Sequence, residues 1–82
     1  MESEILAEIR RIASQELEIS HLVEPSDQLI QDLELDSLGA TVLAVGLEDK
    51  FRIRLSPEDS GQVETVQDLV QLVARRARGV AG

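Results

Sequence analysis

The chain has 82 residues, enough for one modest hydrophobic core, so we expect residues 1–82 to form a single domain. Its net charge is −8, and nine acids but no Lys or Arg occur between Arg11 and Lys50, a distribution that argues against binding to nucleic acid or anionic membranes. The absence of cysteine excludes disulfides and a thiol nucleophile, and the sequence predicts no signal peptide and no stable membrane insertion, so we expect a cytoplasmic protein.

The first predicted helix covers about residues 4–17. Apolar residues recur there with a period of 3.6, and the acids come early and the arginines late, the order that the helix dipole favours. Ser3 stands directly before this pattern and is the expected N-cap. The stripe expected to face the core consists of Ile5, Leu6, Ile9, Ile12, Ala13 and Leu17.

A long polar loop, residues 18–36, is expected to follow this helix. Pro25, Ser26 and Asp27 form a turn signal within it. Loops of this length are usually either functional or disordered. Apolar residues in the second half of this loop indicate that it packs down on the core, namely Leu29, Ile30, Leu33 and Leu35.

The second predicted helix, residues 37–50, carries no charge from Ser37 to Leu47, although 29% of the chain is charged. One apolar stripe can seat this helix on a core: Ala40, Leu43, Ala44, Leu47 and Phe51. A second stripe lies beside it: Leu38, Thr41, Val42 and Val45. Because so small a protein cannot easily surround a helix, we expect part of the second stripe to form an exposed docking surface. The alternative is a central core helix.

The remaining third of the chain predicts a short extended piece and two more helices. Phe51, Ile53 and Leu55 alternate with exposed arginines, and Ser56-Pro57-Glu58-Asp59 has the form of a helix start over about residues 57–61, which Gly61 ends. Residues 65–68 have capping-box form and open a last helix of about residues 65–78 that Gly79 ends. The expected fold is all-α, a small four-helix bundle of three main helices plus one short helix.

Ser37 stands at the N-terminal end of the uncharged helix. At that place the free backbone N–H groups and the positive end of the helix dipole favour an attached or bound phosphate. The alternative is that Ser37 is only an N-cap, the commonest reason for a serine at such a position.

The sequence resembles the acyl carrier protein family over nearly its whole length. The residues that carry the resemblance are Leu33-Glu34-Leu35-Asp36-Ser37-Leu38, the later Leu43 and Leu47-Glu48-Asp49-Lys50-Phe51, and Thr65-Val66-Gln67-Asp68-Leu69-Val70. The Asp-Ser-Leu motif is short, but its combination with the phenylalanine and the last helix start is specific.

The resemblance implies that Ser37 carries 4′-phosphopantetheine, derived from coenzyme A, through a phosphodiester. Asp36 would help a phosphopantetheinyl transferase engage the site. The implied recognition helix for partner enzymes includes Leu38, Val42, Val45, Glu48 and Asp49. The expected walls of an acyl cavity are Ala40, Leu43, Ala44, Leu47, Phe51, Ile53, Val66 and Leu69.

The expected function is therefore that of a non-catalytic carrier, which presents thioester-bound acyl groups to synthases, transferases or ligases with basic or apolar docking patches. Fatty acid, polyketide or related lipid biosynthesis is the expected setting, and the methionine start and short tail favour a free-standing monomer. Two alternatives stay open: an aminoacyl or peptidyl carrier of a nonribosomal pathway, and an unmodified helical adaptor in which Ser37 is only a cap.

The chain also departs from the family pattern. Family members often have glycine where Glu34 stands and acids where Gly39 and Val42 stand, and they usually have Gly-Ile-Glu in place of Arg52-Ile53-Arg54. These departures indicate partners that dock more through apolar contacts than the housekeeping fatty-acid enzymes do.

Other chemistries do not fit the sequence. The acids around Asp32 begin like a calcium-binding loop, but Ser37 replaces the required glycine and Leu43 the final glutamate. His21 lacks the context of a serine hydrolase, and it is interpreted as a loop residue. We therefore expect no catalytic residue and no metal site.

Overall fold

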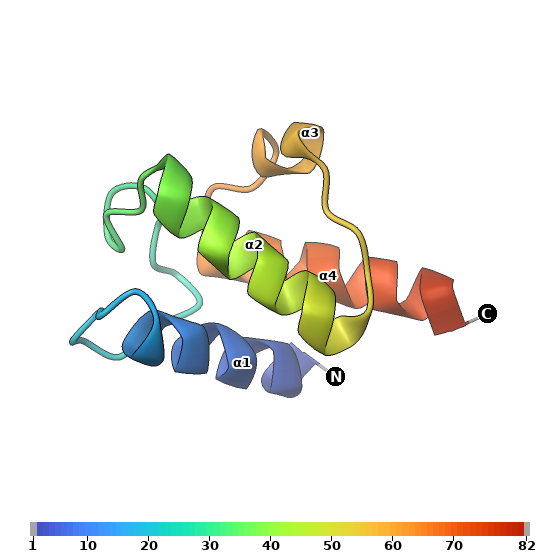
Figure 1. The fold of residues 1–82 in the computed structure, drawn as a ribbon, viewed down its shortest axis with the longest axis horizontal. Coiled ribbons are helices and arrows are strands. Elements are labelled where there is room, and N and C mark those ends of the chain that lie inside the picture. The colour runs from blue at the N-terminus through green and yellow to red at the C-terminus, as the bar shows by residue number, and fades with distance from the viewer. Residues whose placement is uncertain (1, 82) are drawn as a thin grey trace.

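A computed structural model describes residues 2–81, and these form an all-α fold with three main helices (Figure 1). The main helices are α1 (Glu2–Gln15), α2 (Ser37–Phe51) and α4 (Val66–Ala81), and α3 (Pro57–Ser60) is a single turn between α2 and α4. The long loop of residues 16–36 joins α1 to α2. None of the helices in the described range combines the length and apolar character needed to cross a membrane.

The core lies where α1, α2 and α4 pack against one another in pairs. Ile5, Ile9 and Ile12 of α1 are fully buried there, as are Leu47 of α2 and Val73 of α4. Aliphatic side chains fill this centre, as the single aromatic residue of the sequence requires. Such close packing makes the core sensitive to small changes of volume.

Gly46 allows α1 and α2 to approach closely. A Cβ atom at this position would lie 2.6 Å from Cδ1 of Ile12, well inside van der Waals contact. A glycine in the middle of a helix costs about 1 kcal/mol relative to alanine. Here the close packing of α1 against α2 requires the glycine in spite of that cost.

The loop of residues 16–36 is tied to the rest of the fold by backbone hydrogen bonds. The N–H groups of Val66 and Leu29 donate to the carbonyls of Asp27 and Glu64, both at 2.9 Å, which fastens the loop to the start of α4. Val23, Leu33 and Leu35 are buried in the core, so the loop packs down as expected, but Ile30 does not, because its side chain is 69% exposed.

Three predicted helix boundaries are wrong. Ser3 lies inside α1, which already begins at Glu2, so it is not an N-cap. Gly79 does not end the last helix, which continues to Ala81; a glycine weakens a helix without forbidding it, and no glycine of the described residues has a positive φ. The first helix ends at Gln15, two residues earlier than expected, and Glu18 follows with a φ of 55°.

The segment after α2, predicted as a short extended piece, belongs to neither a helix nor a strand over residues 53–56. Phe51 is the last residue of α2, and Arg52 leaves the helix with a φ of 55° in the left-handed region. Ile53 is nevertheless buried while Arg52 and Arg54 are exposed, so the expected alternation of inward and outward side chains is present without a β-ladder.

Candidate functional site

Asp36, rather than Ser37, caps α2. Asp36 has an extended backbone, with φ −95° and ψ −173°, and its Oδ1 accepts a hydrogen bond of 2.7 Å from the N–H of Gly39. Ser37 is the first helical residue after this cap. The alternative interpretation of Ser37 as an N-cap is therefore wrong, because the adjacent aspartate already satisfies the helix end.

The Ser37 hydroxyl is exposed, and no described side chain or backbone group forms a hydrogen bond with it. The backbone carbonyl of Ser37 accepts a 2.8 Å bond from the Thr41 hydroxyl, which leaves the serine side chain uninvolved. Ser56, the residue that precedes α3, makes a useful comparison. Its hydroxyl donates a 3.0 Å hydrogen bond to Oδ2 of Asp59 and is therefore occupied.

An open groove of about 800 Å³ lies beside Ser37, within the range of small-molecule sites. Asp36 and Ser37 belong to its lining, together with side chains of α2, α4 and the segment that contains α3. Of the predicted cavity walls, those that line the groove are Ala40, Leu43, Ala44 and Leu69. Ala40 is exposed on the groove side, whereas Leu43 and Leu69 are buried.

Four other predicted cavity walls do not line this groove. Leu47 and Val66 are fully buried and Ile53 is 5% exposed, all within the central core, while Phe51 packs partly buried against it. These side chains belong to the core or pack against it, and none of them lines the groove. The apolar wall residues that the sequence interpretation missed are Leu29, Ile30, Leu35, Val45, Leu55, Val63 and Leu72.

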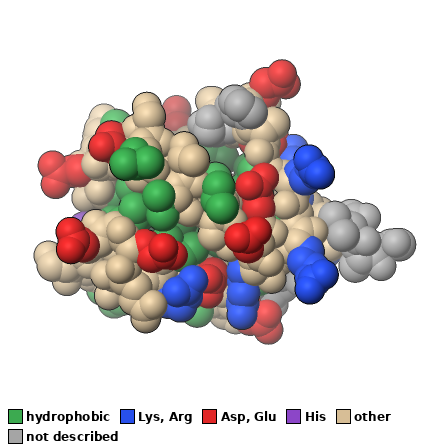
Figure 2. Space-filling model, viewed as in Figure 1, with side chains coloured by type: hydrophobic (Ala, Val, Ile, Leu, Met, Phe, Trp, Pro, Cys, Tyr) green, Lys and Arg blue, Asp and Glu red, His purple; other side chains and the backbone are tan. Residues whose placement is uncertain are grey.

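The second stripe of α2 is divided between the surface and the core. Leu38 is 72% exposed and Val45 is 47% exposed, while Val42 is half-buried and packs on the core. Figure 2 shows apolar side chains gathered on the same face of the molecule as acidic ones. The alternative of a central core helix is wrong, since α2 keeps exposed apolar side chains beside Ser37.

The two acids near the end of α2 differ in their surroundings. Asp49 is exposed. Glu48 is half-buried, lines the groove, and accepts through Oε2 a 2.8 Å hydrogen bond from the N–H of Leu55. The Glu48 carboxylate thus holds the segment after α2 in place.

A further acid, Asp59, lines the groove and is held in its charged form. The N–H of Ser56 donates a 2.8 Å hydrogen bond to Asp59, and the guanidinium of Arg76 lies 2.6 Å from the same carboxyl group. The bond from Ser56 and the contact with Arg76 lower the pKa of Asp59. Within residues 2–81, no group of three or more His, Asp and Glu side chains is arranged to hold a metal ion.

The site therefore offers one unoccupied nucleophilic hydroxyl at a helix N-terminus, with an open apolar groove beside it. A phosphodiester at that hydroxyl would lie near the positive end of the α2 dipole. An arm attached there could place an apolar group into the groove, so the residues present fit a covalently attached phosphate-bearing group.

Comparisons with known proteins agree with this geometry. A family model described as a phosphopantetheine attachment site matches residues 7–73. The chain is 32% identical over 71 residues to the acyl carrier protein of Myxococcus xanthus, covering 85% of this chain and 90% of that protein. It is 37% identical over 73 residues to acyl carrier protein 2 of Ralstonia nicotianae, covering 88% of this chain and 90% of that protein.

The fold of the chain is also similar to that of a solved acyl carrier protein. The crystal structure of an acyl carrier protein from Thermotoga maritima matches with a TM-score of 0.84, covering 96% of this chain and 93% of that chain at 22% identity. The family model spans most of the sequence, and the relatives are similar over most of both lengths. The chain therefore belongs to the acyl carrier protein family, whose members are non-catalytic carriers that bear 4′-phosphopantetheine.

Proposed function

We propose that Ser37 is the attachment point of the 4′-phosphopantetheine group. The observation that supports this most is the free, exposed hydroxyl of Ser37 directly after the capping residue Asp36. In the modification, Ser37 Oγ attacks the phosphorus of coenzyme A that bears the pantetheine. A bond from Oγ to phosphorus forms, the bond from that phosphorus to the adenosine bisphosphate breaks, and the serine proton passes to a base of the transferase.

The attached group supplies a terminal thiol, which bears an acyl group as a thioester and so replaces the cysteine that the chain lacks. We propose that the groove beside Ser37 takes up this acyl chain. Burial of apolar surface contributes about 0.8 kcal/mol for each methylene removed from water. The groove would thus shield the chain between encounters with partner enzymes.

Partner enzymes are proposed to dock on the exposed part of α2. Leu38 and Val45 would provide apolar contacts, Asp49 would pair with a basic patch, and Val42 and Glu48 would contribute at the margin. The transferase is proposed to engage Asp36 at the same end. Because few other apolar side chains of the described residues are exposed, a monomer is the proposed state.

The proposed setting is fatty acid, polyketide or related lipid biosynthesis in the cytoplasm, with residues 1–82 as one carrier domain. The single turn α3 is proposed to act as the fourth, short helix of the bundle, because it forms one side of the acyl groove.

The test of the attachment point is intact mass spectrometry after incubation with coenzyme A and a broad-specificity phosphopantetheinyl transferase. The parent should gain one phosphopantetheine, and Ser37→Ala should gain none. Ser56→Ala is the matched control, since Ser56 also lies at a helix N-terminus, as the N-cap of α3, and also lines the groove. This variant should be modified like the parent. An unmodified parent would favour a helical adaptor.

A further inference from the structure

One side of the groove is formed by the segment that contains α3. Leu55, Ser56, Asp59 and Val63 of this segment line the groove opposite side chains of α2 and α4. We call residues 53–63 the α3 wall. The width of the groove depends on where this wall stands relative to the two long helices.

The α3 wall has few anchors of its own. Among the described residues, the backbone of α3 packs directly against none of the three main helices, and α3 stands apart from α1 in Figure 1. A helix of four residues is too short to be stable alone. The apolar anchors are the buried Ile53 and the half-buried Leu55 and Val63.

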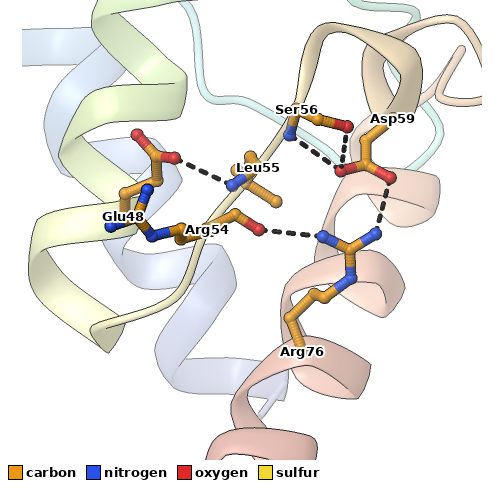
Figure 3. A network of polar contacts seen from close by, with 6 residues as sticks. All are labelled: Glu48, Arg54, Leu55, Ser56, Asp59 and Arg76. Carbon is orange, nitrogen blue, oxygen red and sulfur yellow. Dashed lines mark hydrogen bonds and ion pairs between the residues drawn. The ribbon is translucent and has the colours of Figure 1, made fainter.

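Arg76 of α4 holds the wall at two points, as Figure 3 shows. Its Nη2 donates to Oδ1 of Asp59 at 2.6 Å, and its Nη1 donates to the backbone carbonyl of Arg54 at 2.8 Å. Asp59 in turn accepts hydrogen bonds from the N–H and hydroxyl of Ser56, at 2.8 and 3.0 Å. One guanidinium therefore fixes both the start of the wall and α3 itself.

The base of Arg76 is held in place by the packing of α4. Val73, one turn before Arg76, is fully buried in the core, so the base of the arginine cannot shift easily. The Asp59 side chain is 14% exposed and the Arg76 side chain is 41% exposed, so the charge-assisted bond between them is partly shielded from solvent. Glu48 of α2 accepts a hydrogen bond from the N–H of Leu55. The α3 wall is therefore attached to α2 through Glu48 and to α4 through Arg76.

We propose that Arg76 is a positioning residue that sets the width of the groove and thereby the longest acyl chain that the groove encloses. This inference rests on the proposed function, in which the groove holds the acyl chain of the Ser37-linked arm. When Arg76 cannot bridge Asp59 and the Arg54 carbonyl, the wall moves outward and longer chains fit. A lysine cannot replace it, since one ammonium group lacks the planar fork that serves two separated acceptors.

The test measures the thermal midpoint of the acylated holo-protein for straight, even-numbered chains from butyryl to palmitoyl. In the parent, the midpoint should rise with chain length and stop rising at the length that fills the groove. In Arg76→Lys, Arg76→Gln and Asp59→Asn, the rise should continue to at least the next longer chain. Arg78→Lys and Arg78→Gln are matched controls on the same helix, because Arg78 is exposed and forms none of these bonds with the wall.

A second measurement follows the wall without any acyl chain. Hydrogen exchange at the Leu55 amide of the holo-protein should be about tenfold faster in the Arg76 variants than in the parent, and unchanged in the Arg78 variants. This readout stays informative if one variant is too unstable to acylate.

The possible outcomes separate this inference from the proposed function. If the Arg76 variants lower every midpoint equally and keep the parent's longest favourable chain, Arg76 contributes only to stability and the inference is wrong. If the parent itself shows no dependence on chain length, the proposed acyl groove is wrong. A shift of the longest favourable chain in the Arg76 variants but not in the Arg78 variants supports both.

Discussion

The carboxylate of Asp36 accepts a 2.7 Å hydrogen bond from the backbone N–H of Gly39 and thereby caps α2. Both Asp and Ser are good capping residues, and here the aspartate takes that position. The division of roles between these neighbours leaves the Ser37 hydroxyl available for chemistry. Mutation of Asp36 can therefore distinguish its role as a helix cap from any recognition of its charge by the transferase.

Asp36→Ala should lower the free energy of unfolding by about 1 kcal/mol, because the Gly39 N–H loses its acceptor. Asp36→Asn should cost much less, since asparagine caps about as well as aspartate. Urea denaturation of the unmodified proteins checks both values. If the transferase reads the Asp36 charge, both variants should be modified several-fold more slowly; an Asn variant modified at the parent rate would limit Asp36 to capping.

Glu34→Gly and Arg52→Gly should each stabilise the protein by about 0.5–1 kcal/mol. Both residues have a left-handed backbone, with φ values of 54° and 55°, which costs a residue with a Cβ about 1–2 kcal/mol. Glycine removes that strain, but it also raises the conformational entropy of the unfolded chain, which offsets part of the stabilisation. Arg54→Gly is the control, because it is exposed in the same segment without a positive φ, and it should be destabilising in thermal or urea unfolding.

Gly46→Ala should lower the free energy of unfolding by about 1 kcal/mol, although alanine favours a helix. The new Cβ would lie 2.6 Å from Cδ1 of Ile12, whose side chain is fully buried. Ile12→Val removes that methyl group, so a double-mutant cycle should show the two changes to be less harmful together than their sum. Strict additivity would show that the close approach of α1 and α2 does not limit this position.

Asp59 should make stability depend on pH. The hydrogen bond from the Ser56 N–H, and next the contact with Arg76, lower the pKa of Asp59 in the folded protein. The charged Asp59 therefore stabilises the fold at any pH above the ordinary aspartate pKa of about 3.9. This stabilisation is lost as the pH falls through the lower pKa of the folded state. Asp59→Asn should therefore be less stable than the parent at neutral pH, and the difference should shrink under strongly acidic conditions. A urea midpoint difference that is constant with pH would contradict this assignment.

The parts of the fold that depend on local pattern were predictable from the sequence. The Thr65 and Asp68 capping box forms as expected: the Asp68 N–H donates to Oγ1 of Thr65 and the Thr65 N–H donates to the Asp68 carboxylate. The exposed apolar part of α2 also follows from simple size, since an 82-residue chain cannot enclose an uncharged helix completely.

The walls of the groove were less predictable, because periodicity separates inward from outward positions but does not separate a core from a cavity. Leu47 and Leu43 share one stripe of α2, yet only Leu43 lines the groove. Leu55 was missed since its position depends on the anchors from Glu48 and Arg76, which come from distant parts of the chain. Nothing in the sequence around Ile30 indicates that its side chain is exposed.

The most direct test of the central claim locates the modification within the chain. The protein is produced together with a phosphopantetheinyl transferase, and fragment-ion mass spectrometry then assigns the added mass to a residue. The account predicts one phosphopantetheine on Ser37 and none on Ser56 or any other serine. A protein that stays unmodified, or that carries the group at another residue, would contradict it.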